Sequence, residues 1–218
     1  IATGKERVSA SMTGANQMLL LQHVRFGDGG ANPIFMDLDG THIEFPRQYS
    51  PSTREVYYNS TDNVIGIEYH AGAADTIKHR NSVIESPSKY FWRFRKGSGS
   101  GSYDFTDLTV IGAGYVEMFP VQTVFSRMNF VRCTNMNVWG SKFENCTFTD
   151  CNLVNIIKGL GNNSAVANFV NCTFVSTATT NGSALKFLSG IAGTSDLAYL
   201  DRCTFTGYGA DGTANAAI

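Results

Sequence analysis

The sequence has little charge and no long apolar run. Asp, Glu, Lys and Arg make up 16% of its 218 residues, against roughly 25% in an average soluble domain, and the formal net charge is −1. Because phosphate binding needs an excess of Lys and Arg, this balance argues against nucleic acid as the main partner. No apolar run reaches the roughly 18 residues that cross a bilayer, and the N-terminus lacks the order of a signal peptide. We therefore expect no membrane span.

The number of cysteines is odd, which excludes a complete set of disulfides within one chain. The five cysteines all lie in the second half of the chain, and an odd number cannot pair completely within one chain. The sequence has no Cys-x-x-Cys pair with a nearby His, which is the spacing that zinc sites use. We expect buried, reduced cysteines that act as packing residues, and no required metal or cofactor.

What the sequence does contain is a repeat. Three segments share the order large-x-x-Cys-x-Phe, and a fourth keeps all but the last position; they are Phe143–Phe148, Phe169–Phe174, Leu200–Phe205 and Phe130–Asn135. Residues i and i+2 of a strand share one face, so the Cys and the Phe can both enter a core while the Thr between them stays outside. Stacked coils would then place Cys over Cys and Phe over Phe. Residues 130–206 form the clearest repeat region, which predicts a solenoid of parallel strands.

Two asparagines of the repeat fit the same interpretation. Asn145 and Asn171 each precede the Cys, and Asn tolerates the left-handed turn conformation and can hydrogen-bond along a stacked column. Between Val131 and Leu153 the pattern tightens to a five-residue step, which resembles the pentapeptide-repeat family. The Gly- and Ser-rich insertions at residues 159–164 and 177–183 interrupt that pattern. A looser β-helix therefore fits better.

The first half shows no clean repeat. It contains short strand-like runs separated by turn residues, and no helical stripe; the runs are Met18–Leu21, Val24–Phe26, Ile34–Leu38, His42–Phe45, Val64–Tyr69 and Phe105–Val110. The Gly/Ser segment 97–102 predicts a flexible loop. We expect a single β-helix domain over residues 1–218, with a separate N-terminal domain that ends at this loop as the alternative. The chain begins at Ile1 rather than Met, which fits a processed product or a piece of a longer chain.

These features resemble the right-handed parallel β-helices of phage tailspikes and of polysaccharide lyases and hydrolases. Phrases such as Phe143–Phe148 and Phe169–Phe174 carry the resemblance. It implies an all-β solenoid, a homotrimer, contact with cell-surface glycans and a location on a virion surface or outside the cell. Such folds host both catalysts and purely structural shafts, so the resemblance does not decide between them.

Candidate catalytic residues are few. Asp37 and Asp39 are two residues apart, so on a strand both carboxylates share a face, where mutual repulsion could raise the pKa of one; Asp39-Gly40 is also an ordinary turn dipeptide. The segment from Asp75 to Arg80 combines an acid, a cation and His79, which could exchange protons near neutral pH. A solvated strand edge explains this segment equally well.

A candidate ligand surface lies between Lys89 and Lys96. Tyr90, Trp92 and Phe94 alternate there with Phe91, Arg93 and Arg95. On a strand one set must face outward, and it would offer either aromatic rings for sugars or guanidinium groups for acidic sugars. Ordinary packing of the aromatic set with arginines on the surface is the alternative.

The sequence therefore predicts a virion or cell-surface β-helix that displays a surface for adhesion to a polysaccharide or to a neighbouring virion subunit. An enzyme of the lyase or hydrolase type, which uses Asp37, Asp39, Asp75 or His79, is the rival hypothesis. A purely structural or capsid-decorating protein is the third.

Overall fold

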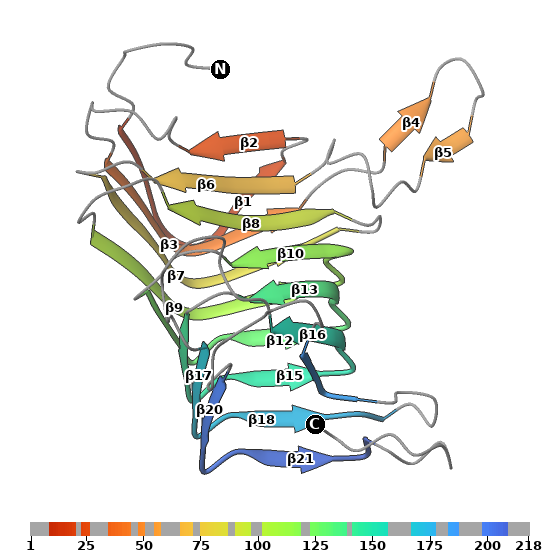
Figure 1. Ribbon diagram of the computed structural model, residues 1–218. Coiled ribbons are helices and arrows are strands. Elements are labelled where there is room, and N and C mark those ends of the chain that lie inside the picture. Colours follow the sequence, from red (N-terminus) through yellow and green to blue (C-terminus); the bar gives the residue numbers. More distant parts are fainter. Residues whose placement is uncertain are drawn as a thin grey trace.

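The computed structural model describes fourteen stretches of the chain, in all of which the regular structure is β-strand. They are residues 9–20, 23–26, 35–44, 48–50, 55–57, 66–71, 75–86, 90–96, 102–118, 123–138, 141–156, 167–177, 183–187 and 198–208. For some strand residues only the backbone is described. The protein is all-β, and its two large sheets are parallel throughout (Figure 1).

The strands differ in length along the chain. Early strands of up to 12 residues give way to strands of three to five. In order they are β1 (Ser9–Leu20), β2 (His23–Phe26), β3 (Phe35–Glu44), β4 (Gln48–Ser50), β5 (Glu55–Tyr57), β6 (Gly66–Ala71), β7 (Thr76–Glu85), β8 (Phe91–Lys96), β9 (Ser102–Ile111), β10 (Tyr115–Met118), β11 (Val124–Ser126), β12 (Asn129–Val131), β13 (Thr134–Val138), β14 (Lys142–Glu144), β15 (Thr147–Thr149), β16 (Asn152–Ile156), β17 (Ala167–Val170), β18 (Thr173–Val175), β19 (Leu185–Phe187), β20 (Ala198–Asp201) and β21 (Thr204–Thr206).

The first sheet divides at β9. Strands β1, β3, β7 and β9 lie side by side along their whole length, but the two halves of β9 pair with different strands. Phe105 lies beside Phe125 of β11, and Val110 lies beside Phe130 of β12. Below β9 the sheet therefore has two arms: the first arm is β11, β14, β17 and β20, and the second arm is β12, β15, β18 and β21.

The second sheet supplies a third row of strands. Its order is β2, β6, β8, β10, β13, β16 and β19, all parallel, and only the short hairpin β4–β5 is antiparallel among the described pairs. From β11 onward the chain visits the first arm, the second arm and the second sheet in turn, and then begins again one strand further down (Figure 1).

A column of left-handed residues makes the corner between the two arms. Asp107, Arg127, Asn145, Asn171 and Arg202 have φ between 51° and 56°, and the strand registers on both sides place them one above another. The Asn145 backbone N–H donates to Val170 O of β17, and Asn171 Nδ2 donates to Asn145 Oδ1 at 2.6 Å. The expected role of Asn145 and Asn171 is confirmed. Asn and Asp adopt this conformation at low cost, whereas Arg must be held there by the bonded neighbours.

The corner explains the repeat. In Phe143–Phe148, Phe143 lies in the first arm, Asn145 is the left-handed corner residue, Cys146 points inward at the bend and Phe148 lies in the second arm. Only Asn145 and Cys146 separate β14 from β15, and Asn171 and Cys172 likewise separate β17 from β18. The motif is therefore one bend with an apolar residue on each side.

The core consists of aromatic ladders. In the first arm the rings of Phe125, Phe143 and Phe169 stack at 5.2 and 4.9 Å. In the second arm those of Phe130, Phe148, Phe174 and Phe205 stack at 5.2, 4.7 and 4.8 Å. The Phe-over-Phe prediction is confirmed. Each offset aromatic pair contributes about 0.5–1.5 kcal/mol beyond its buried area.

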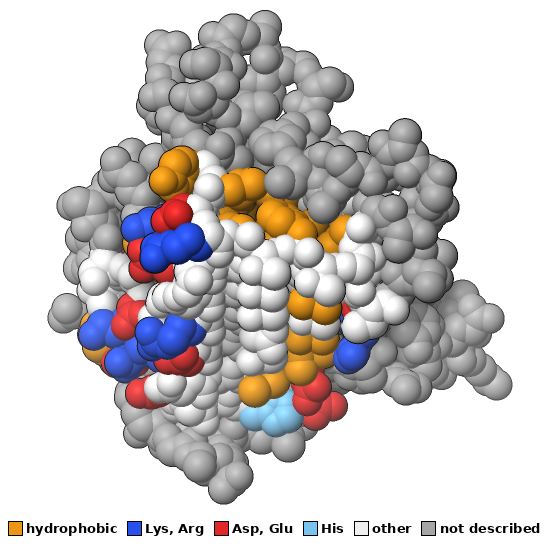
Figure 2. Space-filling view, turned by 90° about the horizontal axis from the view of Figure 1, so that it is seen from below, with side chains coloured by type: hydrophobic (Ala, Val, Ile, Leu, Met, Phe, Trp, Pro, Cys, Tyr) orange, Lys and Arg blue, Asp and Glu red, His pale blue; other side chains and the backbone are white. Residues whose placement is uncertain are grey.

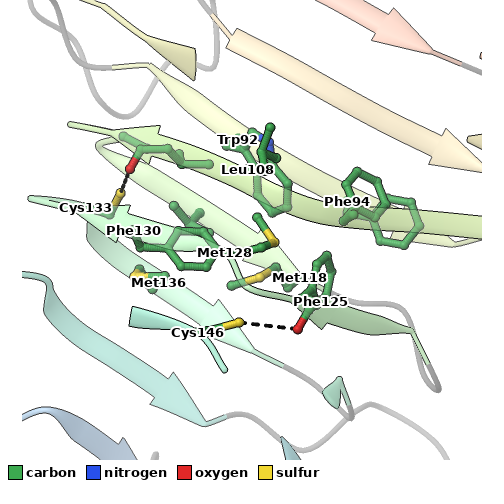
Figure 3. Close-up of a cluster of buried hydrophobic side chains, with 14 of the residues drawn as sticks. Trp92, Phe94, Leu108, Met118, Phe125, Met128, Phe130, Cys133, Met136 and Cys146 are labelled. Atoms are coloured by element: carbon green, nitrogen blue, oxygen red, sulfur yellow. Dashed lines mark hydrogen bonds between the residues drawn. The ribbon is translucent and has the colours of Figure 1, made fainter. Parts of the chain in front are cut away.

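All five cysteines are free, and four are fully buried. Each thiol lies within hydrogen-bonding distance of a carbonyl in the preceding coil; Cys146 Sγ is 3.3 Å from Phe125 O and Cys133 Sγ is 3.4 Å from Val110 O (Figure 3). The prediction of reduced packing cysteines is confirmed for the four buried ones.

Several boundaries differ from those expected; the predicted run Met18–Leu21, for example, is the end of β1, which begins at Ser9. The predicted runs Ile34–Leu38 and His42–Phe45 form one strand, β3, because Gly40 takes φ 64° and bends the strand without ending it. Ser102, expected at the end of the Gly/Ser loop, is already the first residue of β9, and the rest of that loop lies outside the described residues. Strands on the two sides of the loop, β7 and β9, pair in one sheet.

Candidate functional site

Asp37 and Asp39 share the outward face of β3, as the sequence predicts, and the guanidinium of Arg80 on the neighbouring strand β7 contacts both carboxylates. Arg80 Nη2 is 2.8 Å from Asp37 Oδ1 and 3.5 Å from Asp39 Oδ2. Asn81 Nδ2 donates to Asp39 Oδ1 at 2.7 Å. The hydrogen bond to Asp37 raises the pKa of the Arg80 guanidinium, which stays charged. Asp37, Asp39 and Arg80 therefore have the geometry of a surface ion-pair network.

His79 is fully buried, on the opposite face of β7 from Arg80. Its Nδ1 lies 2.6 Å from the hydroxyl of Tyr69, and its Nε2 lies 3.4 Å from Oγ1 of Thr41. Burial lowers the pKa of His79 to about 3. This position disfavours the proton exchange near neutral pH that the sequence suggests for His79, because an imidazolium in this core would lose its hydration.

Asp75 is also buried, at 2% exposure. Its backbone carbonyl accepts a hydrogen bond from the Ser102 amide at 2.8 Å. Asp75 and His79 face inward while Arg80 faces outward, so strand alternation divides the Asp75–Arg80 group between two sides of the sheet. These residues do not form one site.

The aromatic set of β8 faces the core. Trp92 and Phe94 are fully buried (Figure 3). Both rings pack edge-on against the rings of Phe105 and Phe125, with centroid distances between 4.9 and 6.2 Å. Tyr90 is 3% exposed, and its hydroxyl lies 2.9 Å from Ile84 O and 2.8 Å from Ile111 O. These three side chains are packed as core residues and offer no ring to a sugar in this structure.

Arg93 faces the other side of the second sheet, yet only 9% of it is exposed. Its guanidinium lies over the rings of Phe91, at 4.7 Å, and Tyr115, at 5.1 Å. Its Nε is 3.3 Å from Glu117 Oε2, and its Nη1 is 3.8 Å from Glu68 Oε2. Arg93 is therefore engaged with its own sheet. Arg95 belongs to β8, but its side chain lies outside the described residues.

The described side chains hold no group of three His, Cys, Asp or Glu that could bind a metal ion. In the same residues no helix has the length and hydropathy to cross a membrane.

The surface that sequence reasoning missed lies on the second arm. We call it the threonine strip: the outward side chains of the second half of β9 and of β12, β15, β18 and β21. Strand registers arrange them in two columns, Thr109, Asn129, Thr147, Thr173 and Thr204 in one, and Ile111, Val131, Thr149, Val175 and Thr206 in the other. All are half-buried or exposed, and none is ionisable. Figure 2 shows a broad uncharged area with charged side chains gathered along its border.

The borders of the strip carry charged side chains, and several of these side chains are paired within the protein. At the corner column, Arg127 donates to both carboxylate oxygens of Asp107 at 2.7 and 2.6 Å, which lowers the pKa of Asp107. At the end near β3, His42 Nε2 lies 2.7 Å from Glu85 Oε1. On the border opposite the corner column, the Asp150 carboxylate accepts a hydrogen bond from the backbone N–H of Thr177 at 2.6 Å.

A signal for the strip exists in the sequence. Thr147, Thr173 and Thr204 each follow the Cys of a repeat, at the position that the strand period places outside. What the sequence does not provide is the register that aligns these residues with Thr109 and Asn129 into one surface.

Comparisons with protein-family models, with curated proteins and with solved structures found no match.

Proposed function

We propose that the chain is a right-handed parallel β-helix whose three faces are the first arm, the second arm and the second sheet. The cyclic order of the strands from β11 to β21, the parallel registers and the stacked phenylalanine ladders support this architecture. Right-handedness follows from the strong preference of parallel crossover connections for that hand.

We further propose that the protein belongs to a virion or cell surface, as a tailspike- or appendage-like homotrimer, and acts by adhesion to polysaccharide. The observation that carries this proposal is the threonine strip. It combines hydroxyl and amide groups, which exchange hydrogen bonds with sugar hydroxyls, with methyl groups, which pack against sugar C–H faces. Because the stacked core holds these side chains in place, little ordering entropy is lost on binding.

Catalysis is the less favoured role. A glycosidase needs a carboxylic acid and a second carboxylate on either side of the scissile bond. Asp37 and Asp39 instead contact Arg80, and His79 and Asp75 are buried. A purely structural role would need a broad contact face for neighbouring subunits.

The test is to incubate the full chain with a panel of purified bacterial surface polysaccharides and to follow both retention of the protein and release of shortened chains. Retention without shortening is the expected result. Shortened chains would make the protein a depolymerase and would direct mutation to Asp37 and Asp39. If the protein is not retained and no chains are shortened, the purely structural role becomes the favoured one.

A further inference from the structure

We propose that the threonine strip selects uncharged polysaccharides and that the glycan lies across the strands, along the two columns. This inference rests on the proposed adhesive function and names its ligand class. It follows from three properties of the strip: its repeat, its charge and its size.

The repeat favours a linear polymer. Neighbouring strands are about 4.8 Å apart, and two outward residues of one strand are about 6.7 Å apart. A chain that runs across the strands therefore meets Thr or Asn in the first column at every strand and Thr, Val or Ile in the second, such as Thr147 with Thr149 and Thr173 with Val175. A polymer of similar units can satisfy such a surface along its length, whereas a single small molecule uses only one coil.

The charge of the strip favours a neutral polymer. A carboxylate or sulfate group on the ligand would lose hydration on this surface and would need a cation in return. The arginine of the adjoining corner, Arg127, already binds Asp107 through two hydrogen bonds. On the opposite border the exposed Arg132 follows Val131, and the register between β12 and β15 places it next to Asp150, so a carboxylate of the protein lies near this cation as well. Neutral sugars require no cation, and the hydroxyl groups of the strip can exchange hydrogen bonds with the sugar hydroxyls.

The size of the strip argues against a second copy of the chain as its occupant. Five strands with two outward rows cover about 300 Å², whereas a stable protein interface buries about 800 Å² on each partner. Beyond this area the surface carries His42 and Glu85 at one end and the charged corner at the side. A narrow uncharged band fits one extended glycan chain better than a folded partner.

The experiment measures binding of the full chain to neutral and acidic bacterial surface polysaccharides of matched length, immobilised at the same density. The variants are Thr147→Glu and Thr147→Val on the strip, with Val124→Glu as the matched control. Val124 is 40% exposed on β11 of the first arm, beside Lys142, so this control adds the same charge on another face. Thermal unfolding establishes that each variant is folded.

We expect the parent chain to bind neutral polysaccharides at least tenfold more tightly than acidic ones. Thr147→Glu should weaken the neutral binding at least tenfold and Thr147→Val several-fold, since the latter removes only the hydroxyl, while Val124→Glu should leave binding unchanged. Neutral binding that survives Thr147→Glu would overturn the assignment to the strip.

Other outcomes separate this inference from the adhesive function. Preference for acidic polysaccharides, weakening with added salt, would overturn the inference and keep adhesion. No binding to any polysaccharide would overturn both. Loss of oligomers on Thr147→Glu, measured by light scattering, would make the strip a subunit contact and also overturn the inference.

Discussion

The hydroxyl of Tyr69 lies 2.6 Å from Nδ1 of His79, and this contact joins the second sheet to the first through the middle of the core. If Tyr69 donates to Nδ1, the neutral imidazole carries its proton on Nε2, which faces Thr41 Oγ1. The Thr41 hydroxyl donates to Ser82 Oγ at 3.0 Å, and the Ser82 hydroxyl donates to Arg80 O at 2.6 Å. This series of hydrogen bonds gives both ring nitrogens of the buried His79 a partner. On the neighbouring strand β9 the equivalent position is occupied by Phe105, which needs none.

The buried histidine predicts acid sensitivity. The pKa of His79 is about 3 in the folded protein against 6.5 for the free side chain. The unfolded chain therefore takes up a proton below pH 6.5 that the folded chain refuses until about pH 3, and stability falls across this window. Between pH 7 and pH 5 the free energy of unfolding should fall by about 2 kcal/mol, at about 1.36 kcal/mol per pH unit below 6.5.

Urea unfolding at several pH values measures this loss, with His79→Phe as the control. The phenylalanine matches the neighbouring ladder residue and cannot titrate. Its stability should be independent of pH between 7 and 5, whatever its absolute value. An equal slope in both proteins would assign the acid sensitivity to other groups.

The second prediction concerns the phenylalanine ladder of the second arm. Phe148 is fully buried between Phe130 and Phe174. Phe148→Ala should lower the free energy of unfolding by about 3–5 kcal/mol through the cavity that it leaves. Phe148→Asp should abolish cooperative unfolding, because it places an unpaired charge in the stack. The control Thr149→Asp, one residue along and outward, should melt cooperatively; a Phe148→Asp protein that melts like the parent contradicts the stacking.

The third prediction concerns the corner column. Asn145 has φ 56°, where alanine costs about 1–2 kcal/mol and glycine has no steric penalty. Asn145→Ala should therefore be clearly less stable than Asn145→Gly in thermal or urea unfolding. Both variants lose the hydrogen bond from Asn171, so the difference between them isolates the backbone conformation. Equal stability of the two variants would show that the corner does not require the left-handed conformation.

The fourth prediction concerns thiol reactivity. Cys203 is half-buried, whereas the other four cysteines are fully buried, and burial raises the pKa of Cys146. A reagent must reach the sulfur before it can react, so an aromatic disulfide reagent should modify Cys203 first in the native protein. Mass spectrometry of peptides after brief labelling identifies the site, and Cys203→Ala should remove the fast phase. Early labelling of Cys146 would contradict its place in the core.

Sequence periodicity predicts one part of this fold well and another part poorly. The ladders of Phe148 and Phe174 follow from the two-residue period and from the repeat, because both signals are local. The contact between Tyr69 and His79 depends on how the two sheets face each other, which no local pattern contains. The direction of β8 was ambiguous because both of its faces carry large side chains, and in the structure Phe91 and Arg93 are covered as well as Trp92.

The candidate sites show the same division. That Asp37 and Asp39 share a face follows from strand geometry alone. Their pairing with Arg80 depends on the register between β3 and β7, which places Asp39 beside Arg80. The threonine strip likewise needs four registers at once, although the outward direction of Thr147 was predicted correctly.

The corner between the two arms has a fixed length. Arg127 and Met128 separate β11 from β12, and Arg202 and Cys203 separate β20 from β21, with the same spacing in the coils between. The spacing varies on both sides of the second-sheet strands. Residues 139–141 separate β13 from β14 but residues 157–166 separate β16 from β17, and residues 150–151 separate β15 from β16 but residues 176–184 separate β18 from β19. The repeats can therefore diverge in length during evolution at these junctions while the left-handed corner is inherited unchanged. The same junctions are the places where foreign peptides can be grafted with the least disturbance to the ladders.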